Sequence, residues 1–389
     1  VYHHDYNHPL FRAEALTIDG QWQNPLFGRN TWKPGTKTSN LAYAQRDPAP
    51  FRWHSSDRFA FGEAVFEGAY QNLVFNYRYG EYGRVETGGE ALVNVRSARQ
   101  VLQLRHSRLY IVTDKVHFAD PEQRRREHTF AMPSQLALST QKKGATEPFS
   151  TEQAELDAAA RQICTANPDG ANVTVHQFAD LPIAYRLEGK AKPDFRKYAH
   201  RLSEYTGIAE QDLTATLKTN GDLALVSLIA SRPQGGESRV KTIEPMNRGP
   251  EIAGFHATLR DGSDVWYQAA AHGAAELTCG PVSAVAETLT VTSDRSSEIS
   301  GVALGCEEMT VRGASVTASH RDFEFSLLNT EHRTLNAVPI YRPVSPVRFT
   351  PERNFFTDTL TVTMTSATPG VEIRYTTDGT PPGRSSQLY

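Results

Sequence analysis

The stretch RLYIVTDKVHF, residues 108–118, alternates apolar and polar side chains along its length. Successive side chains of a β-strand point to opposite faces of a sheet, so this order lets one face be buried while the other meets water. A helix would scatter the same apolar residues around its circumference. We therefore predict a strand here.

The same alternation returns in many short runs that are separated by glycine, asparagine, aspartate and proline. Clear examples are ANVTVHQF (171–178), TLTVT (288–292) and DFEFSL (322–327). Numerous strands without helices between them favour antiparallel sheets over a parallel sheet with crossover helices. The expected fold is all-β: a large antiparallel β-sandwich with minor helices, plus a small immunoglobulin-like β module.

Two stretches depart from the alternation and predict short helices. Residues 150–164 begin with the capping-box pair Ser150 and Gln153 and continue into an alanine-rich middle. In residues 194–205, apolar side chains recur at helical spacing. We expect both helices as additions to a β framework.

Two breaks in composition divide the chain. SRPQGGE (231–237) and the proline cluster at 339–351 are poor in residues that continue a sheet. The expected domains are residues 1–232, a first β-sandwich part; residues 233–342, its continuation or a second β-sheet domain; and residues 343–389, a small β module.

The composition is typical of a globular protein, with 39% hydrophobic and 22% charged residues among 389. The formal net charge of −3 argues against nucleic acid as a partner, because phosphate binding needs a basic face. Residues 1–110 hold 13 lysines and arginines against 10 acidic residues, so an anionic ligand suits this part best. The longest strongly apolar stretch, residues 223–230, is far shorter than the roughly 20 residues of a membrane helix, and we expect no membrane span.

The cysteines and the first residue carry less information. The three cysteines, Cys164, Cys279 and Cys306, show no CxxC spacing and are expected as small buried side chains. The chain begins at Val1 without a methionine, so we expect it to be a piece of a longer polypeptide.

The densest group of chemically able side chains opens the chain, in VYHHDYNHPLFRAEALTIDG (1–20). His3, His4 and His8 stand there together with Asp5 and Asp19. Imidazole and carboxylate together suit zinc, and histidine also serves as an acid, a base or a charge neutraliser. An exposed strand end with histidines and no metal is the alternative that the local sequence leaves open.

Residues 59–118, FAFGEAVFEGAYQ…NVRSARQVLQLRHSRLYIVTDKVHF, resemble the β-sandwich part of heparinase II/III-like polysaccharide lyases. In that family an arginine-bearing strand leads into a strand that ends in valine and aspartate, and Arg99 and Asp114 stand at the matching positions. The opening is similar to the family segment in which histidines precede a strand and an aspartate–glycine turn. His3 and Asp19 match the spacing of its structural zinc ligands.

The resemblance implies cleavage of a uronate-containing acidic polysaccharide by β-elimination. The uronate carboxylate is neutralised, the proton on the adjacent carbon is removed, and the glycosidic oxygen leaves. The tyrosine base and the asparagine and histidine neutralisers of such lyases lie largely on an N-terminal α-helical toroid that this chain lacks. The chain would then form one wall of the cleft and show little activity alone.

The same resemblance implies roles for the opening residues and a location for the protein. His3 or His4 would be catalytic, and a zinc at His3 and Asp19 would take a third ligand from His4, His8 or His54. His3 and Asp19 are then expected to converge from neighbouring strands. A bacterial protein that is secreted or periplasmic is also implied.

The sequence offers candidates for the glycan-contacting wall. Tryptophan rings stack on sugar faces and arginine pairs with carboxylates through two hydrogen bonds, which together suit an acidic glycan. The candidates are Arg29, Asn40, Trp53 and His54, with Trp22 and Trp32 beside them. Packing of each tryptophan in the core is the open alternative.

Two further groups of arginines are expected to be solvated surface. They are the sheet face with Arg96, Arg99, Arg105 and Arg108, and the turn Arg124–Arg126.

The tail VEIRYTTDGTPPGRSSQLY, residues 371–389, resembles the immunoglobulin-like C-terminal domain of chitobiases, which is appended to bacterial carbohydrate-active enzymes. Its threonines, aspartate and glycine suit a tight turn, and the proline pair stiffens the exit. No catalytic group is implied there.

Three classes of function remain open at this point. The chain is part of a polysaccharide lyase, or a carbohydrate-binding β-sandwich without chemistry of its own, or a surface protein built of β domains. The third is the weakest, because the sequence shows no internal repeat of fixed period.

Overall fold

The computed structural model describes residues 16–24, 51–75, 85–142, 154–165, 172–192, 205–233, 235–295, 298–316, 320–327, 336–340, 347–350, 361–366, 371–377, 382–383 and 386–389. Antiparallel strands make up nearly all of this part, which confirms the all-β expectation. The one helix in the described ranges is α1 (Pro121–Arg124).

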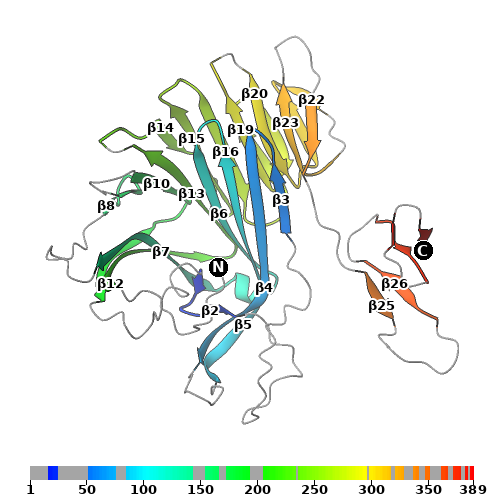
Figure 1. The fold of residues 1–389 in the computed structure, drawn as a ribbon, viewed down its shortest axis with the longest axis horizontal. Coiled ribbons are helices and arrows are strands. Elements are labelled where there is room, and N and C mark those ends of the chain that lie inside the picture. The colour runs from blue at the N-terminus through cyan, green and yellow to red at the C-terminus, as the bar shows by residue number, and fades with distance from the viewer. Residues whose placement is uncertain are drawn as a thin grey trace.

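The largest sheet, sheet B, has nine strands and runs through the middle of the molecule (Figure 1). Eight strands follow the order β2-β4-β5-β6-β13-β10-β9-β8, and β3 pairs with β4. Their bounds are β2 Trp22–Asn24, β3 Phe51–Ser55, β4 Phe59–Phe75, β5 Val85–Leu104, β6 Leu109–Phe118, β8 Ala154–Asp157, β9 Gln162–Thr165, β10 Asn172–Phe178 and β13 Leu223–Arg232.

Three more sheets stack on sheet B or on one another. Sheet A has the order β1 (Thr17–Ile18), β7 (Glu127–Lys142), β12 (Tyr205–Asn220) and β11 (Ala184–Lys192). Sheet C has the order β14 (Val240–Pro245), β15 (Ile252–Leu259), β16 (Asp264–Ala270), β19 (Thr288–Ser293), β20 (Ile299–Leu304), β23 (Phe323–Leu327) and β24 (Asn336–Pro339). Sheet D has the order β17 (Ala275–Cys279), β18 (Val282–Ala286), β21 (Glu308–Val311) and β22 (Ala314–Val316).

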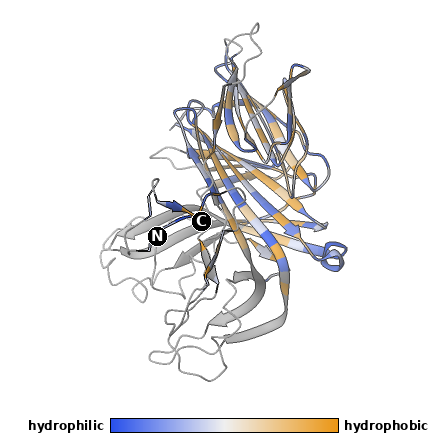
Figure 2. Ribbon diagram, turned by 90° about the vertical axis from the view of Figure 1, so that its right-hand side faces the viewer, coloured by the Kyte–Doolittle hydropathy of each residue, from blue (hydrophilic) through white to orange (hydrophobic). Residues whose placement is uncertain are grey.

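Three apolar cores hold these sheets as layers in the order A, B, C, D. One core joins sheets A and B, the largest joins B and C, and the third joins C and D. Figure 2 shows the alternation of polar and apolar positions along the strands that makes this stacking possible. Because the core between B and C takes residues from both sides of position 232, the described part of residues 233–340 packs directly on the preceding part.

Strand β6 shows how the layers use the sequence. Its odd positions Leu109 and Ile111 enter the core toward sheet C, and its even positions Val116 and Phe118 enter the core toward sheet A. The alternation predicted one solvated face. In the structure only the first half of β6 keeps one, because sheet A covers the second half.

The helix expected at residues 150–164 is wrong over its described part, because residues 154–165 form the hairpin β8–β9. Asp157 pairs with Gln162, and the turn between them places Arg161 at φ +51°. Arg161 donates hydrogen bonds to two backbone carbonyl oxygens, those of Ala179 (2.6 Å) and Leu181 (2.9 Å). Pairing of β9 with β10 and the burial of Ile163 override the helix propensity of the alanines.

The second expected helix, residues 194–205, lies outside the described residues except for Tyr205, which begins β12. The turn expected at Arg124–Arg126 is formed by α1 and its C-terminal end. The Asp120 carboxylate caps this helix by accepting a hydrogen bond from the Glu122 backbone amide.

In the C-terminal part, two strand pairs are described. They are β25 (Arg348–Thr350) with β26 (Thr363–Thr365), and β27 (Arg374–Tyr375) with β28 (Gln387–Leu388). Across the described ranges, no helix has the length and apolar character needed to cross a bilayer.

Candidate functional site

Strand β3, with the sequence FRWHS, is an edge strand of sheet B on which neighbouring side chains have different roles. It pairs with β4 in the register Arg52↔Glu63, Trp53↔Gly62 and His54↔Phe61. Because side chains alternate along a strand, Arg52 and His54 share one face and Trp53 points to the other. We call the side toward sheet C the inner face of sheet B and the opposite side its outer face.

On the inner face, Arg52 is the centre of a buried ion-pair network. Its Nε and Nη2 atoms donate to the two carboxylate oxygens of Glu63 at 2.8 and 2.7 Å. Nη2 also donates to Glu287 (2.8 Å), and Nη1 donates to Asp322 (3.0 Å). Glu287 follows β18 and Asp322 precedes β23, so one guanidinium group ties the edge of sheet B to sheet C.

The network continues across sheet B through polar side chains on the same face. Gln100 donates to Glu63 (2.5 Å) and accepts from the Thr288 hydroxyl (3.1 Å). The Lys115 ammonium donates to that hydroxyl (2.9 Å) and to the Glu287 backbone carbonyl (3.1 Å). Every one of these groups therefore has a charged or hydrogen-bonding partner inside the sandwich.

The pKa values in this network follow from burial and from neighbouring charges. Burial lowers the pKa of Lys115 to about 8, although Glu63 and Glu287 act in the opposite direction. Burial alone would raise the pKa of Glu63, but hydrogen bonding and charge from Arg52 lower it overall. Burial would likewise lower the pKa of Arg52, but its three carboxylate partners raise it above the usual range.

His54 makes a second contact parallel to the first. Its Nε2 atom lies 2.6 Å from a carboxylate oxygen of Glu324, and both side chains are nearly buried. Arg52 and His54 are two residues apart on β3, as Asp322 and Glu324 are two apart at β23, so matched pairs bridge the sheets. This contact faces away from Trp53, and the two candidates His54 and Trp53 therefore do not share one surface.

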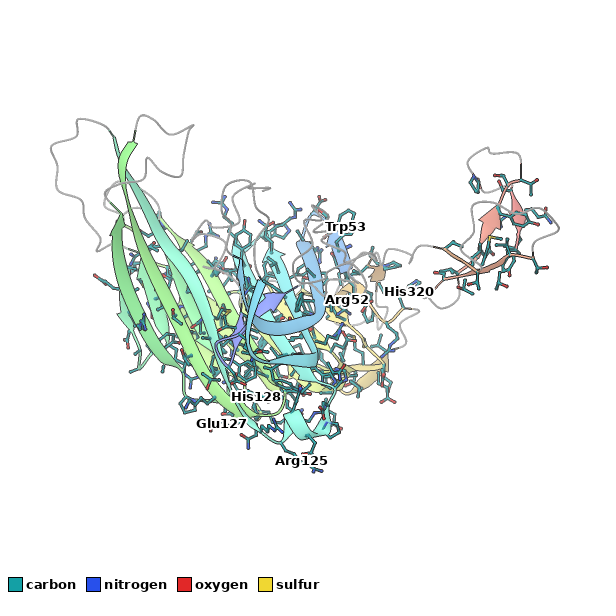
Figure 3. The ribbon with its side chains drawn as sticks, turned by 90° about the horizontal axis from the view of Figure 1, so that it is seen from below. Arg52, Trp53, Arg125, Glu127, His128 and His320 are labelled. Carbon is teal, nitrogen blue, oxygen red and sulfur yellow. The ribbon has the colours of Figure 1, made fainter. Side chains whose placement is uncertain are left out.

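On the outer face, Trp53 is exposed. Its exposed fraction is 49%, and two other large apolar side chains on this face, Val101 on β5 and Tyr110 on β6, are 40% and 43% exposed. Figure 3 shows Trp53 at the rim of the molecule and Arg52 among the strands. Trp53 was predicted to contact a glycan, and about half of its side chain is accessible to solvent.

Arg99 and Asp114, the positions singled out by the family resemblance, are cross-strand partners on the outer face. They are paired in the β5–β6 register, and Arg99 Nε donates to Asp114 Oδ1 at 2.7 Å. Burial raises the pKa of Asp114, and the charge of Arg99 opposes the change. Arg99 Nη2 also lies 3.6 Å from the Met132 sulfur on β7, so this pair marks where sheet A begins to cover sheet B.

Asp19, the predicted metal ligand, contacts a histidine that the sequence analysis did not select. Its Oδ2 atom lies 2.8 Å from His128 Nδ1, and its Oδ1 atom accepts a hydrogen bond from the Thr129 backbone amide. His128 Nε2 lies 2.8 Å from the Gln123 carbonyl oxygen. Both ring nitrogens of His128 thus lie at hydrogen-bonding distance from oxygen atoms, and these contacts join β1, α1 and β7.

Several predicted site residues lie outside the described part of the chain. They are His3, His4, His8, Arg29, Trp32 and Asn40, together with the side chain of Trp22. Convergence of His3 with Asp19 stays a prediction. Within the described ranges, no group of three or more histidine, cysteine, aspartate or glutamate side chains is placed to hold a metal ion.

Arg52 was not among the predicted site residues, and His54 was predicted as a glycan contact, not as an anchor of β3. A signal was nevertheless present: polar side chains at alternate positions of two strands, in FRWHS and in the DFEFSL stretch. Inward-facing polar side chains two residues apart on one strand need polar partners at the same spacing on another. Nothing in the local sequence says which two strands face each other.

Comparison with known proteins finds two partial likenesses. Residues 351–389 match the family model described as chitobiase/beta-hexosaminidase C-terminal domain. No curated protein matches the chain. In contrast, solved structures of polysaccharide lyases align with part of it.

The heparan sulfate lyase HepC from Pedobacter heparinus is 10% identical, with a TM-score of 0.36 over 57% of this chain and 28% of that chain. A mutant of that lyase gives the same values. A structure of heparinase III is 12% identical, with a TM-score of 0.32 over 55% of this chain and 26% of that chain. The matched regions thus span only about a quarter of the lyases' own length, and these scores carry no conclusion about activity.

Proposed function

We propose that this chain is the C-terminal part of a polysaccharide lyase that cleaves a uronate-containing acidic polysaccharide by β-elimination, and that it forms one wall of the substrate cleft. The sequence resemblance over residues 1–118 suggests the reaction. The structural observation that supports the proposed glycan contact is the position of Trp53, which lies on the outer face of sheet B with a 49% exposed side chain.

The division of labour in the reaction follows from what the described residues can do. β-Elimination needs a general base and a cation or hydrogen-bond donor at the developing enolate. At the outer face of β3–β6, the described part offers a ring for stacking and two arginines for carboxylates, while its carboxylate, Asp114, is paired with Arg99 and its tyrosine, Tyr110, accepts a hydrogen bond from Gln103. We assign the base to sequence outside this chain, on the α-helical toroid, and keep His3 and His4 as catalytic candidates.

The groups around Asp19 show whether the described residues could bind the implied zinc. Zinc sites in proteins use about three or four protein ligands. Asp19 supplies one carboxylate that already accepts from the Thr129 amide, and both nitrogens of His128 are engaged. The described residues therefore do not complete a zinc site. A structural zinc at His3 and Asp19 remains a proposal, which metal analysis of the purified chain and of Asp19→Ala would test.

The secreted or periplasmic location belongs to the same proposal, because a large acidic polysaccharide is met outside the cell. The alternative function is a carbohydrate-binding β-sandwich protein without catalysis. It is favoured by the same Trp53 surface, because stacking on a sugar ring requires no acid or base.

The absorbance of unsaturated uronate products in the ultraviolet tests the proposal. We expect the 389-residue chain to bind polygalacturonate or heparan sulfate but to give little product, and a longer polypeptide that includes the toroid to give product at enzymatic rates. Fast turnover by the chain alone, abolished by His3→Ala, would move the chemistry into this chain. Binding without turnover in the longer polypeptide would favour the non-catalytic alternative.

A further inference from the structure

The outer face of β3–β6 carries a strip of side chains in one cross-strand row. The registers align Trp53 on β3 with Gly62 on β4, Val101 on β5 and Val112 on β6. Neighbouring strands lie about 4.8 Å apart, so the row is about 14 Å long. It runs across the strands, not along them.

Sheet A leaves this strip uncovered. The core between sheets A and B uses Val95, Val116 and Phe118 on β5 and β6, all beyond the Arg99–Asp114 pair. None of the strip residues takes part in that core. Trp53 and Val101 are exposed, and Val112 and Gly62 are partly so. The strip is therefore surface in a sandwich whose other layers are packed together.

Gly62 makes the strip open beside the tryptophan. A Cβ atom built on Gly62 meets nothing within 4 Å. The Trp53 ring therefore borders a flat position with no side chain, followed by the small Val101. A ring-shaped ligand can lie along this surface in contact with the indole.

Arginines border the strip on both sides. Along the outer face of β5, Arg99, Val101 and Gln103 follow one another at alternate positions, and Arg105 comes directly after the end of the strand at Leu104. At about 3.4 Å per residue, the two arginines lie about 20 Å apart. The Arg99 side chain is 37% exposed, and Arg105 is exposed. Arg105 Nη2 donates to the Ser55 hydroxyl at 2.9 Å, which holds it on the β3 side of the hairpin.

The polar residues at the strip suit a hydroxyl-bearing ligand with negative charges. Gln103 donates to the Tyr110 hydroxyl at 3.0 Å, which orders the next row above the strip. Among the described outer-face side chains of β3–β6, the charged ones are Arg99 and Asp114, and Asp114 is buried against Arg99. Arg105, in the turn after β5, adds a second exposed arginine. The exposed charge on this face is therefore positive.

We propose that the row Trp53–Gly62–Val101–Val112 is the binding site of an anionic glycan chain that crosses the strands. A sugar ring stacks on Trp53 and over Gly62, while carboxylate or sulfate groups of the chain reach Arg105 and Arg99. The identity of the glycan as uronate-containing rests on the proposed function. The site itself rests on the exposed ring, the open glycine and the flanking arginines.

The test changes Gly62, where an added side chain points into open space and is expected to leave the fold intact. Gly62→Glu and Gly62→Lys add side chains of similar length and opposite charge. Both block the surface to a similar extent, so a difference in affinity between the two variants reports the effect of charge. With the 389-residue chain and polygalacturonate or heparan sulfate as the probe, we expect Gly62→Glu to bind at least about tenfold more weakly than Gly62→Lys, because like charges repel.

Substitutions of Arg105 and Trp53 provide two further tests of the site. We expect Arg105→Ala to weaken binding about threefold to tenfold, and Arg125→Ala, an exposed arginine on the loop after α1, to leave it unchanged. Trp53→Ala is expected to weaken binding about tenfold, with partial rescue by Trp53→Tyr. Neutral dextran should not bind at the same concentrations.

The outcomes of these measurements distinguish a failure of the proposed binding site from a failure of the proposed lyase function. Equal binding by Gly62→Glu and Gly62→Lys would overturn the site but leave the lyase proposal, which product formation measures separately. Equal binding of dextran would overturn the anionic class. Loss of self-association in place of glycan affinity would make the strip a protein contact. Intact glycan binding with no product in the longer polypeptide would keep the site and reject the lyase.

Discussion

The two faces of β3 differ in what they bury. On the inner face, Arg52 and His54 lie against Glu63, Asp322 and Glu324, nearly shielded from water. On the outer face, the side chain of Trp53, which lies between them in the sequence, is about half exposed to solvent. Adjacent residues of one short strand thus serve opposite purposes.

The difference shows how an edge strand can present a rigid binding residue. Edge strands have one backbone edge unpaired and are easily displaced. The contacts that Arg52 and His54 make on either side of Trp53 fix β3 to sheet C, so the tryptophan is held at the sheet surface. A preorganised aromatic ring loses less conformational entropy on binding a ligand.

The largest expected effect comes from removing the inner anchor. Arg52→Ala removes the guanidinium partner of the buried Glu63 and Asp322 carboxylates, and we expect the unfolding free energy to fall by about 3–5 kcal/mol. Urea denaturation measures this. Arg321→Ala, which breaks an exposed pair with Glu307, is the control and should cost at most about 1 kcal/mol. A loss of similar size in both variants would contradict the anchoring role of Arg52.

The second expected effect is a pH dependence of stability from Lys115. Its pKa is about 8 in the folded protein, whereas in the unfolded chain the amine keeps an ordinary value of about 10.4. Between these two pH values the unfolded chain binds more protons, so the contribution of Lys115 to stability rises with pH. We expect the stability of the wild type relative to Lys115→Met to increase by about 2 kcal/mol from pH 8 to pH 10.5. A flat or falling difference would show that burial does not depress this pKa.

A smaller effect is expected at the second inner contact. His54→Ala leaves the Glu324 carboxylate without this partner, and we expect unfolding free energy to fall by about 1–3 kcal/mol. The double variant with Glu324→Gln should lose less than the sum of the single losses, because the residues are in contact. Full additivity in a double-mutant cycle would mean that the pair does not couple β3 to β23.

The smallest effect on stability is expected on the outer face. Trp53→Ala removes a half-exposed side chain that belongs to none of the apolar cores. The melting temperature of this variant should therefore stay close to that of the wild type. Glycan affinity should fall as described above. A stability loss as large as that of Arg52→Ala would mean that Trp53 is a packing residue, and the two faces of β3 would no longer differ in purpose.

Prediction from the sequence succeeded where the alternation of apolar and polar residues within one segment indicates a strand. The alternation of RLYIVTDKVHF predicted the strand β6 correctly, whereas the glycan contact at Trp53 stays a prediction. It was wrong for residues 154–165, where alanines favoured a helix but pairing with β10 and the contacts of Arg161 required a hairpin. It also placed His54 beside Trp53, although a period of two puts consecutive residues on opposite faces.

The sequence by itself determined the all-β class, because apolar periodicity is a local property that each strand carries. Only the tertiary structure decided which faces are covered. It placed Asp322 and Glu324 opposite Arg52 and His54, some 270 residues apart in sequence. It also left the strip at Trp53 outside the packing of sheet A. Pairing and stacking of sheets depend on contacts between distant segments, and their energies cannot be assigned to any single stretch of the chain.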